Sequence, residues 1–168
     1  MVVLLGDELK NFVESYVKIN PAGIDVKPKK IYRIPSDEID YIVIDGNKRG
    51  YYISNNFYKI PENLIEVKPE ENYWILDKGF YYVVFPKVII PKDCIAIAFP
   101  RSTFNRLGIL KFESALFDPG YEGEFTQTYY FPFKAKINIE EAWIQLVFIR
   151  LEKEAKELYK GYWQKEKY

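Results

Sequence analysis

The chain has 168 residues, a length at which one domain buries about 70% of its unfolded surface and forms a core without disulfides. It carries 24 Lys and Arg against 24 Asp and Glu, and a formal net charge of zero argues against bulk nucleic-acid binding, which draws on a basic surplus. A single cysteine, Cys94, and the absence of histidine exclude a disulfide framework, two-His zinc sites and imidazole catalysis. No apolar run approaches the roughly 18–20 residues that span a bilayer, and no basic signal-peptide region is present. We therefore expect a cytoplasmic protein with neither a membrane nor a nucleic-acid partner.

The first elements are predicted from hydrophobic spacing. Residues 7–17 carry apolar side chains at helical intervals behind Asp7, a residue suited to N-capping, which predicts a short amphipathic helix. From Lys18 onward, short runs rich in Ile, Val, Tyr and Phe alternate with Pro, Gly, Asn and Asp. These runs include residues 41–44, 51–53, 73–76 and 81–85. Strand-length runs at this spacing predict a β-sandwich, a barrel or a jelly roll.

The second half of the chain continues in predicted strands. Residues 88–90 and 95–99 predict two buried strands joined by a Pro-Lys-Asp turn. Residues 124–131 alternate in polarity, which predicts one arm of a hairpin whose other arm is 111–117.

The last part of the chain combines one strand with an irregular arm. One face of the strand predicted at 142–151 carries Trp143, Gln145, Val147 and Ile149. Gln145 stands where an apolar residue is expected, which fits a core amide bonded to backbone groups. Residues 152–168 are charged and aromatic, and we expect them to be part helical and part loose, as a closing arm or a docked terminus. Without a repeat or a linker, residues 1–168 are predicted to form one all-β domain.

A segment with two of the five arginines is the first candidate for chemistry. Arg101 and Arg106 lie in Pro-Arg-Ser-Thr-Phe-Asn-Arg-Leu-Gly, residues 100–108. Arginine presents a planar fork of donors to phosphate and carboxylate oxygens, and hydroxyl groups add neutral donors. Placed after a strand, this segment is suited to cradle an anion, although a capped surface helix with solvated arginines is the simpler alternative.

Two turns hold aspartates. Phe-Asp-Pro-Gly-Tyr-Glu-Gly, residues 117–123, would hold Asp118 at a rigid corner and offer the ring of Tyr121 to a base or sugar. Asn-Pro-Ala-Gly-Ile-Asp, residues 20–25, is a turn that leads to Asp25. Each segment alone also fits an ordinary turn.

Together, the order and spacing of these segments resemble the dCTP deaminase/dUTPase superfamily. Pro-Ala-Gly-Ile-Asp is followed by Pro-Arg-Ser-Thr-Phe-Asn-Arg-Leu-Gly, then Phe-Asp-Pro-Gly-Tyr-Glu-Gly, then Trp-Ile-Gln-Leu-Val-Phe. The family shows Pro-Ala-Gly-hydrophobic-Asp, Arg-Ser-Ser-x-x-Arg-x-Gly, an Asp-x-Gly-Tyr/Trp-x-Gly hairpin and an Ala/Val-Gln-hydrophobic strand in that order. The resemblance covers about residues 18–165, and Phe-Ile-Arg-Leu-Glu after the glutamine strand is similar to the archaeal dUTPase branch.

The resemblance implies a distorted β jelly roll of the β-clip type with a short N-terminal helix, assembled as a homotrimer with sites between subunits. It implies that Asp118 meets the deoxyribose 3′-hydroxyl and positions the attacking water, and that Tyr121 and its hairpin read base and sugar. It implies that Asp25 helps to hold magnesium through water. The residues implied at the triphosphate are Arg101, Ser102, Thr103 and Arg106. The matched positions that remain are Gln145 on its strand and, in a tail that closes over the phosphates, Tyr159 and Gln164. This tail lacks the Gly-rich ending of many trimeric dUTPases.

One departure from the family pattern decides the predicted chemistry. Deaminases of the family read Gly-x-hydrophobic-Thr-hydrophobic-Glu after the hairpin, and this glutamate shuttles protons at the cytosine ring. Alignment on Gly123 puts Thr128, a candidate substrate-binding residue, in its place. A threonine hydroxyl is not usefully ionised near neutral pH, so it cannot serve as that acid or base. Attack of water on an α-phosphorus depends less on proton transfer than deamination does, and more on neutralisation of phosphate charge. Arginines, hydroxyl groups and Mg²⁺ can neutralise that charge.

The prediction is therefore a dUTP pyrophosphatase that converts dUTP and water to dUMP and pyrophosphate, with Mg²⁺ as cofactor and its own chain as partner. Two alternatives stay open. One is a dCTP deaminase in which Glu122 or Glu124 replaces the missing glutamate, although Glu124 lies four positions too early in its strand, roughly 13 Å away. The other is a catalytically inactive, nucleotide-binding trimer of the same fold.

Overall fold

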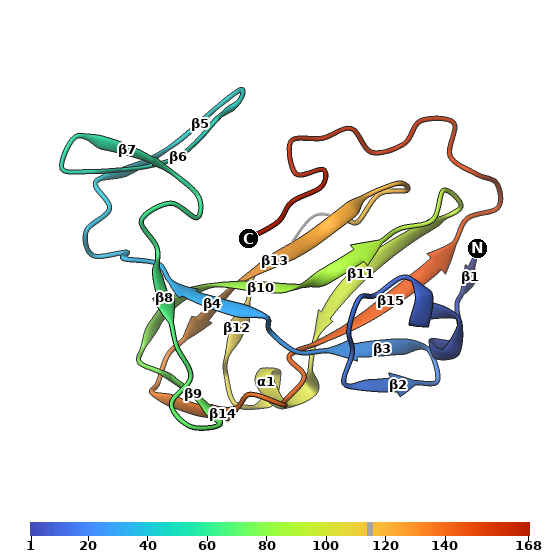
Figure 1. Cartoon of the computed structure of the whole chain (residues 1–168), viewed down its shortest axis with the longest axis horizontal. Coiled ribbons are helices and arrows are strands. Elements are labelled where there is room, and N and C mark those ends of the chain that lie inside the picture. Colours follow the sequence, from blue (N-terminus) through green and yellow to red (C-terminus); the bar gives the residue numbers. More distant parts are fainter. Residues whose placement is uncertain (114–115) are drawn as a thin grey trace.

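The computed structural model describes residues 1–113 and 116–168, and most of its regular structure is β (Figure 1). In chain order the strands are β1 (Val2–Val3), β2 (Lys18–Asn20), β3 (Gly23–Val26), β4 (Lys30–Arg33), β5 (Tyr41–Asp45), β6 (Lys48–Ile53), β7 (Asn56–Lys59), β8 (Ile65–Val67), β9 (Tyr73–Leu76), β10 (Gly79–Ile89), β11 (Cys94–Pro100), β12 (Leu110–Lys111), β13 (Glu122–Phe131), β14 (Ala135–Asn138) and β15 (Ile144–Arg150). The helices of the described residues are a 3₁₀ helix (Gly6–Asn11) and α1 (Ser102–Arg106). Neither is long and apolar enough to cross a membrane.

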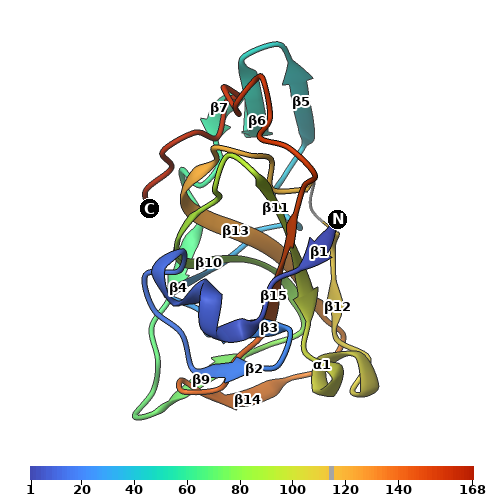
Figure 2. The same cartoon turned by 90° about the vertical axis from the view of Figure 1, so that its right-hand side faces the viewer.

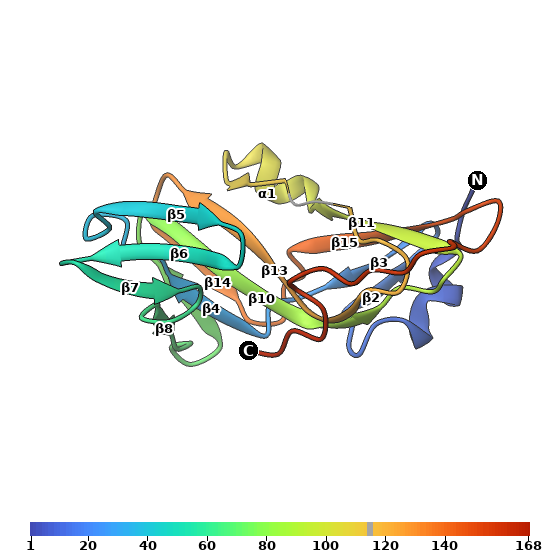
Figure 3. The same cartoon turned by 90° about the horizontal axis from the view of Figure 1, so that it is seen from above.

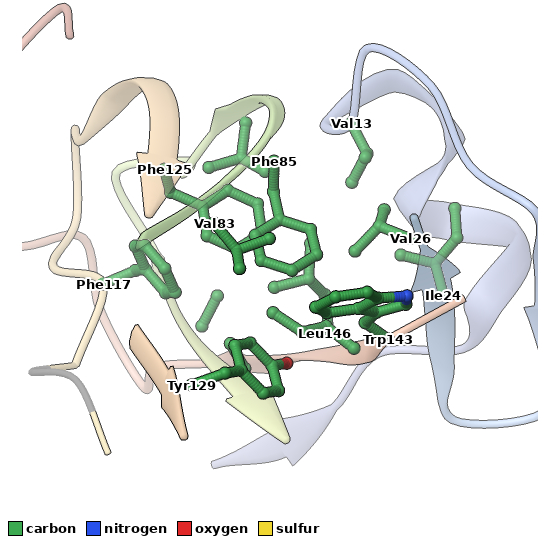
Figure 4. Packing of buried hydrophobic residues seen from close by; sticks show 14 of the residues in the cluster. Val13, Ile24, Val26, Val83, Phe85, Phe117, Phe125, Tyr129, Trp143 and Leu146 are labelled. Carbon is green, nitrogen blue, oxygen red and sulfur yellow. The ribbon is translucent and has the colours of Figure 1, made fainter. Parts of the chain in front are cut away.

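Two five-stranded sheets form the body. The first has the order β1-β15-β3-β2, with β11 also paired to β15, and the second has the order β12-β13-β10-β4-β8. The longest pairing joins β10 to β13 in antiparallel fashion. Side chains of both sheets meet in one hydrophobic layer, where Val83 and Phe125 of the second sheet lie near Trp143 and Leu146 (Figure 4). This double-sheet arrangement confirms the predicted all-β, jelly-roll-like fold.

Aromatic packing fixes α1 to the body. Alternate residues of β13 point inward, and Phe125, Tyr129 and Phe131 are fully buried. The ring of Phe104 in α1 joins this cluster, with its centroid 5.1 Å from that of Trp143 and 5.9 Å from that of Tyr129. Because buried aromatic rings remove about 150–250 Å² each from water, this contact sets the position of α1 and of the arginine segment.

A three-stranded sheet, β5-β6-β7, projects from the body at the end opposite the N-terminus (Figures 1 and 3). Tyr41 of β5 stacks on Tyr52 of β6 with ring centroids 4.8 Å apart. Ile42 and Ile44 remain 67% and 77% exposed. Ile60, the residue that directly follows β7, lines the candidate site described below.

The N-terminal helix differs from its prediction. It is a 3₁₀ helix over Gly6–Asn11 and not an amphipathic helix over 7–17. The chain that follows lies along β10, where the Ile89 N–H donates to the carbonyl of Phe12 at 2.8 Å. The backbone carbonyl of Phe12 thus accepts a hydrogen bond from β10 and is not available to a continuing helix.

The strand boundaries around Pro86 were also predicted incorrectly. Residues 81–85 and 88–89 belong to one strand, β10, whose register with β13 shifts between Phe85 and Lys87, and Ile90 lies just beyond its end. Because Pro86 has no N–H to donate to β13, the pairing is interrupted at this residue. The register shift absorbs the interruption, so β10 continues as a single strand on both sides of Pro86.

The hairpin arm predicted at 111–117 is not a continuous strand among the described residues. Only β12 pairs with β13 there, at its far end, and Phe117 instead forms an isolated bridge with Ala96. Residues 114–115 of the predicted arm lie outside the described residues.

The prediction that Gln145 is a core amide is wrong, although Gln145, Val147 and Ile149 share one face of the strand as expected. β15 buries Ile144, Leu146 and Phe148, whereas Gln145 lies on the half-buried opposite face. Residues 152–168 contain turns and bends without a helix or strand, so the predicted helical part is absent from the arm.

Candidate active site

The arginine segment is held at its first residue and points its polar side chains outward. Arg101 is extended and directly precedes α1. Its backbone N–H donates to the carbonyl of Trp143 at 2.9 Å, while Phe104 anchors the helix in the core. The exposed side chains that result are Ser102, Thr103 and Arg106.

Asp25 on β3 is 2% exposed and forms an ion pair with the guanidinium of Arg101. Its Oδ1 atom has no hydrogen-bond partner among the described residues. A buried carboxylate is costly without a cation, so this pair holds the fork of Arg101 in place. Gln145 lies opposite Asp25 across the β15–β3 pairing. No group of three or more His, Cys, Asp or Glu in the described part of the chain could hold a metal ion.

The turn before β13 presents Asp118. The Tyr121 N–H donates to the carbonyl of Asp118 at 3.1 Å and closes the turn, and the Asp118 side chain is exposed. Gly120 has φ +83°, and a Cβ there would come 2.8 Å from the Cβ of Leu158. Glycine is therefore required both for the backbone conformation and for the close approach of the arm.

Tyr121 lies largely inside the protein. It is 5% exposed, and its hydroxyl donates to the carbonyl of Glu124 at 2.9 Å. Burial raises the pKa of this hydroxyl. Its ring lies 5.5 Å from that of Tyr159, so Tyr121 contributes a wall to the site and its hydroxyl is already engaged.

The arm, residues 152–168, lies over this turn (Figures 1 and 2). Gln164 holds it there, because its Oε1 accepts from the Glu122 N–H at 2.9 Å and its Nε2 donates to the carbonyl of Gly120 at 2.8 Å. The Tyr159 N–H donates to the carbonyl of Pro119 at 2.8 Å. These hydrogen bonds, made by the Gln164 side chain and the Tyr159 backbone, thus bring both predicted tail residues to the side of Asp118.

A cavity of about 340 Å³ opens between the turn, β13 and the arm. Its walls are mainly aromatic, with a few polar groups, as is usual for small-molecule sites. The lining residues are Ile60, Tyr82, Leu116, Phe117, Asp118, Tyr121, Phe125, Thr126, Gln127, Tyr159, Trp163 and Glu166. The cavity therefore gathers Asp118 and two predicted aromatic residues in one place.

The arginine segment is remote from this cavity within the chain. Asp118 precedes the start of β13, whereas α1 packs on Tyr129 near the end of that strand. The ten residues of β13 extend over roughly 30 Å. Figures 1 and 2 both place α1 at the opposite side of the body from the arm. A second, larger cavity of about 630 Å³ is lined by Arg101 and Thr103.

Some residues of the cavity were not found from the sequence. Gln127 interrupts the inward series of Phe125 and Tyr129 on β13, and this break in alternation is a signal that could have pointed to it. Glu166 carried no such signal, because it is one of many charged residues in the arm. Thr128 lies two residues beyond Thr126 on β13 and is not among the lining residues of this cavity, so its role in the site stays a prediction.

Comparison with known proteins identifies the family. A family model described as dCTP deaminase-like matches residues 7–151. The chain belongs to this family. It is 32% identical to a probable deoxyuridine 5′-triphosphate nucleotidohydrolase from Methanosarcina mazei, covering 94% of this chain and 87% of that protein. It is 35% identical to a deoxyuridine 5′-triphosphate nucleotidohydrolase from Methanocaldococcus jannaschii over 68% of each chain.

A solved structure supports the same fold. The crystal structure of a 2′-deoxycytidine 5′-triphosphate deaminase from Agrobacterium tumefaciens matches with a TM-score of 0.60 and 16% sequence identity. The match covers 89% of this chain and 49% of that one, so this chain spans about half of the deaminase chain. At this identity the likeness concerns the fold alone.

Proposed function

We propose that this protein is a dUTP pyrophosphatase, which hydrolyses dUTP to dUMP and pyrophosphate. The observation that carries the proposal is the aromatic cavity beside Asp118, in a family member whose β13 has Thr128 where deaminases have glutamate. Its volume, about 340 Å³, suits a nucleoside. The names of the archaeal relatives support the same substrate.

The reaction is an in-line attack of water on the α-phosphorus. Asp118 orients this water and accepts a hydrogen bond from the 3′-hydroxyl of the deoxyribose, and backbone groups of its turn read uracil. The residues that stabilise charge on the triphosphate are Arg101, Ser102, Thr103 and Arg106, with Gln145, Tyr159 and Gln164 in supporting contacts. Prearranged donors of this kind act on developing charge without reorganising during the reaction.

Magnesium enters this proposal with the substrate. The carboxylate of Asp25 is held by the Arg101 cation, and its surroundings do not fit a resident metal ion. Mg²⁺ commonly binds substrate phosphates and keeps several waters, so it needs no all-protein cage. The substrate is therefore the magnesium complex of dUTP, and Asp25 acts on Arg101.

The site is shared between subunits of a homotrimer. Asp118 and Arg106 are separated by roughly the length of β13 and cannot contact one nucleotide within one chain. A second copy that brings its α1 to the cavity completes the site, which is a heterologous contact that closes into a ring. Residues 1–168 form one domain in this assembly.

The alternative activity, dCTP deamination, requires a carboxyl that shuttles protons. Glu122 and Glu124 are poor candidates. The hydrogen bond from Lys87 lowers the pKa of Glu122. Burial alone would raise the pKa of Glu124, but hydrogen bonds from Lys29 and from the Tyr168 N–H outweigh it and lower that pKa. A proton shuttle works best with a pKa near the operating pH, so neither group suits the role.

Parallel assays with dUTP and dCTP test the proposal. The purified protein with Mg²⁺ is expected to release pyrophosphate and dUMP from dUTP, and no ammonia from dCTP. Chromatography of nucleotides and an ammonia assay give both readouts from one incubation. Stoichiometric conversion of dCTP to a uracil nucleotide would overturn the assignment, and binding of dUTP without turnover would favour the inactive trimer.

A further inference from the structure

We propose that Glu166 is a further substrate-site residue, whose carboxyl latches the arm over the cavity that contains Asp118. This inference rests on the proposed function, because it assigns the cavity to the nucleotide. Glu166 belongs to no motif considered above. It comes from the arm, whereas Asp118 comes from the turn before β13, and both line the same cavity.

Hydrogen bonds hold Glu166 at this position. Its carbonyl accepts from the Glu124 N–H at 2.9 Å, so the backbone of the arm is tied to the start of β13. Its carboxyl oxygen Oε1 accepts from the hydroxyl of Tyr168. That hydroxyl lies 3.0 Å from the hydroxyl of Tyr82 on β10, whose side chain is also bonded to Thr126. A chain of polar groups therefore joins the arm to the floor of the cavity.

Tyr168 is itself fixed by groups that do not reach Glu166. The Tyr168 N–H donates to Glu124 at 2.7 Å, and Lys30 donates to the Tyr168 carbonyl at 2.8 Å. Lys29 forms an ion pair with Glu124. The two nearby lysines are thus committed to other acceptors.

The surroundings of Glu166 favour the neutral acid. Within the described residues Glu166 has no ion-pair partner, and the charged group that shares its cavity is the carboxylate of Asp118. The other titratable groups that line its cavity or contact its carboxyl are Tyr82 on β10, Tyr121 in the turn, and Tyr159 and Tyr168 in the arm. The carboxylate of Glu124 on β13 is bonded to Lys29 and to the Tyr168 N–H. A carboxylate without a counter-ion is disfavoured in such a place. Accordingly, burial raises the pKa of Glu166 to about 7, although the Tyr168 hydroxyl partly opposes this rise.

This arrangement makes arm closure dependent on pH near neutrality. Below pH 7 the neutral carboxyl stays in the cavity wall and the arm closes over the nucleotide. Above pH 7 the ionised group is drawn toward water because burial disfavours its charge, so the closed arm becomes less populated. Because an apparent affinity falls with the competent fraction, KM for dUTP should rise about tenfold between pH 6 and pH 8.

The experiment compares wild type with Glu166→Gln over pH 6–8.5, using Glu157→Gln as the matched control on an exposed arm residue. Glutamine stays neutral and keeps a donor and an acceptor. We expect a low KM at all pH values for Glu166→Gln, and the wild-type rise for Glu157→Gln. In Tyr168→Phe the pH at which KM has risen halfway should be higher than in wild type. The reason is that the hydroxyl that opposes the raised pKa of Glu166 is lost. An equal rise in wild type and Glu166→Gln would overturn the proposal and assign the pH effect to the nucleotide.

Arm closure can also be followed without turnover. Trp163 lines the cavity from the arm, whereas Trp74 and Trp143 are 6% and 0% exposed, so acrylamide quenching of fluorescence mainly reports Trp163. Quenching should increase through pH 7 in wild type and remain constant in Glu166→Gln. This readout keeps the latch testable even if dUTP is not the substrate. Constant quenching in wild type over the same range would contradict the latch.

Discussion

At the scale of single residues, the candidate site depends on a few charges whose environments differ sharply. The carboxylate of Asp25 is buried and holds Arg101, while Asp118 and Arg106 are exposed and free to meet a ligand. A buried charge pair contributes little net stability on average, because desolvation offsets the attraction, but it fixes geometry. Asp25 therefore acts on Arg101 by fixing the orientation of its guanidinium.

Removing the exposed Arg106 side chain should strongly reduce catalysis and leave folding intact. Arg106→Ala is expected to lower kcat/KM at least 100-fold, since a charge-assisted donor in a closed site contributes roughly 2–4 kcal/mol. Arg101→Lys should also be damaging, because lysine keeps the charge but loses the planar fork. Initial rates and thermal unfolding check both variants against Lys78→Ala, an exposed control. Near-native rates in both would favour a solvated surface helix.

A double-mutant cycle separates the two roles considered for Asp25. If Asp25 acts by orienting Arg101, Asp25→Asn combined with Arg101→Lys should cost little more than either change alone, because each breaks the same contact. The Mg²⁺ concentration that gives half-maximal rate should stay unchanged in Asp25→Asn. If the two substitutions instead reduce activity additively and Asp25→Asn raises the Mg²⁺ requirement, the metal-linked role of Asp25 implied by the family resemblance would be supported.

At the scale of elements, the arm and α1 are positioned by different means. α1 has only five residues and is held by the ring of Phe104 in the aromatic core. The arm has no regular structure and is held by hydrogen bonds to the turn before β13. Segments with few buried apolar contacts open at low free-energy cost, so the arm is the part of the site suited to admit substrate.

Loosening the arm should affect substrate affinity more than global stability. Gln164→Ala removes two hydrogen bonds to the turn, each with a net contribution of about 1 kcal/mol. We expect KM for dUTP to rise roughly 5- to 30-fold, with little change in the unfolding temperature of the body. Hydrogen exchange of residues 158–168 should become faster, while Lys156→Ala, on the exposed face of the arm, should not change it. Unchanged exchange in Gln164→Ala would show that other contacts hold the arm.

At the scale of the whole molecule, one chain carries two groups of predicted site residues that do not meet. The cavity beside Asp118 and the arginine segment lie at opposite ends of β13. In the proposed association of identical chains, each contact would bring the cavity of one chain to the arginine segment of the next. The proposed assembly has three copies, and a particle of about three times the 20.0 kDa chain is expected in light scattering.

Mixing two inactive variants tests the shared site directly. Asp118→Asn and Arg106→Ala each disable one of the two groups, so each homotrimer should be inactive. Each mixed trimer has about one shared site in three that combines an intact Asp118 with an intact Arg106, so activity of the isolated mixed trimers should return to about a third of the native value. Co-expression with two different affinity tags, followed by rate measurement, gives the result. No recovery in verified mixed trimers would contradict the shared site.

The sequence by itself determined the all-β class, because turn chemistry and strand alternation are local, and it determined the family through the order of its motifs. Of the residues that line the cavity it pointed to Asp118, Tyr121 and Tyr159. It also located Asp118 and Arg101 in their segments through motif spacing. Only the tertiary structure decided that Asp25 pairs with Arg101, that Gln145 faces outward from the core layer, and that Glu166 enters the cavity of Asp118. These facts depend on which strands become neighbours and where an irregular arm is bonded. Contacts between residues more than forty positions apart, such as Gln164 with the turn at Gly120, leave no periodic trace in the chain.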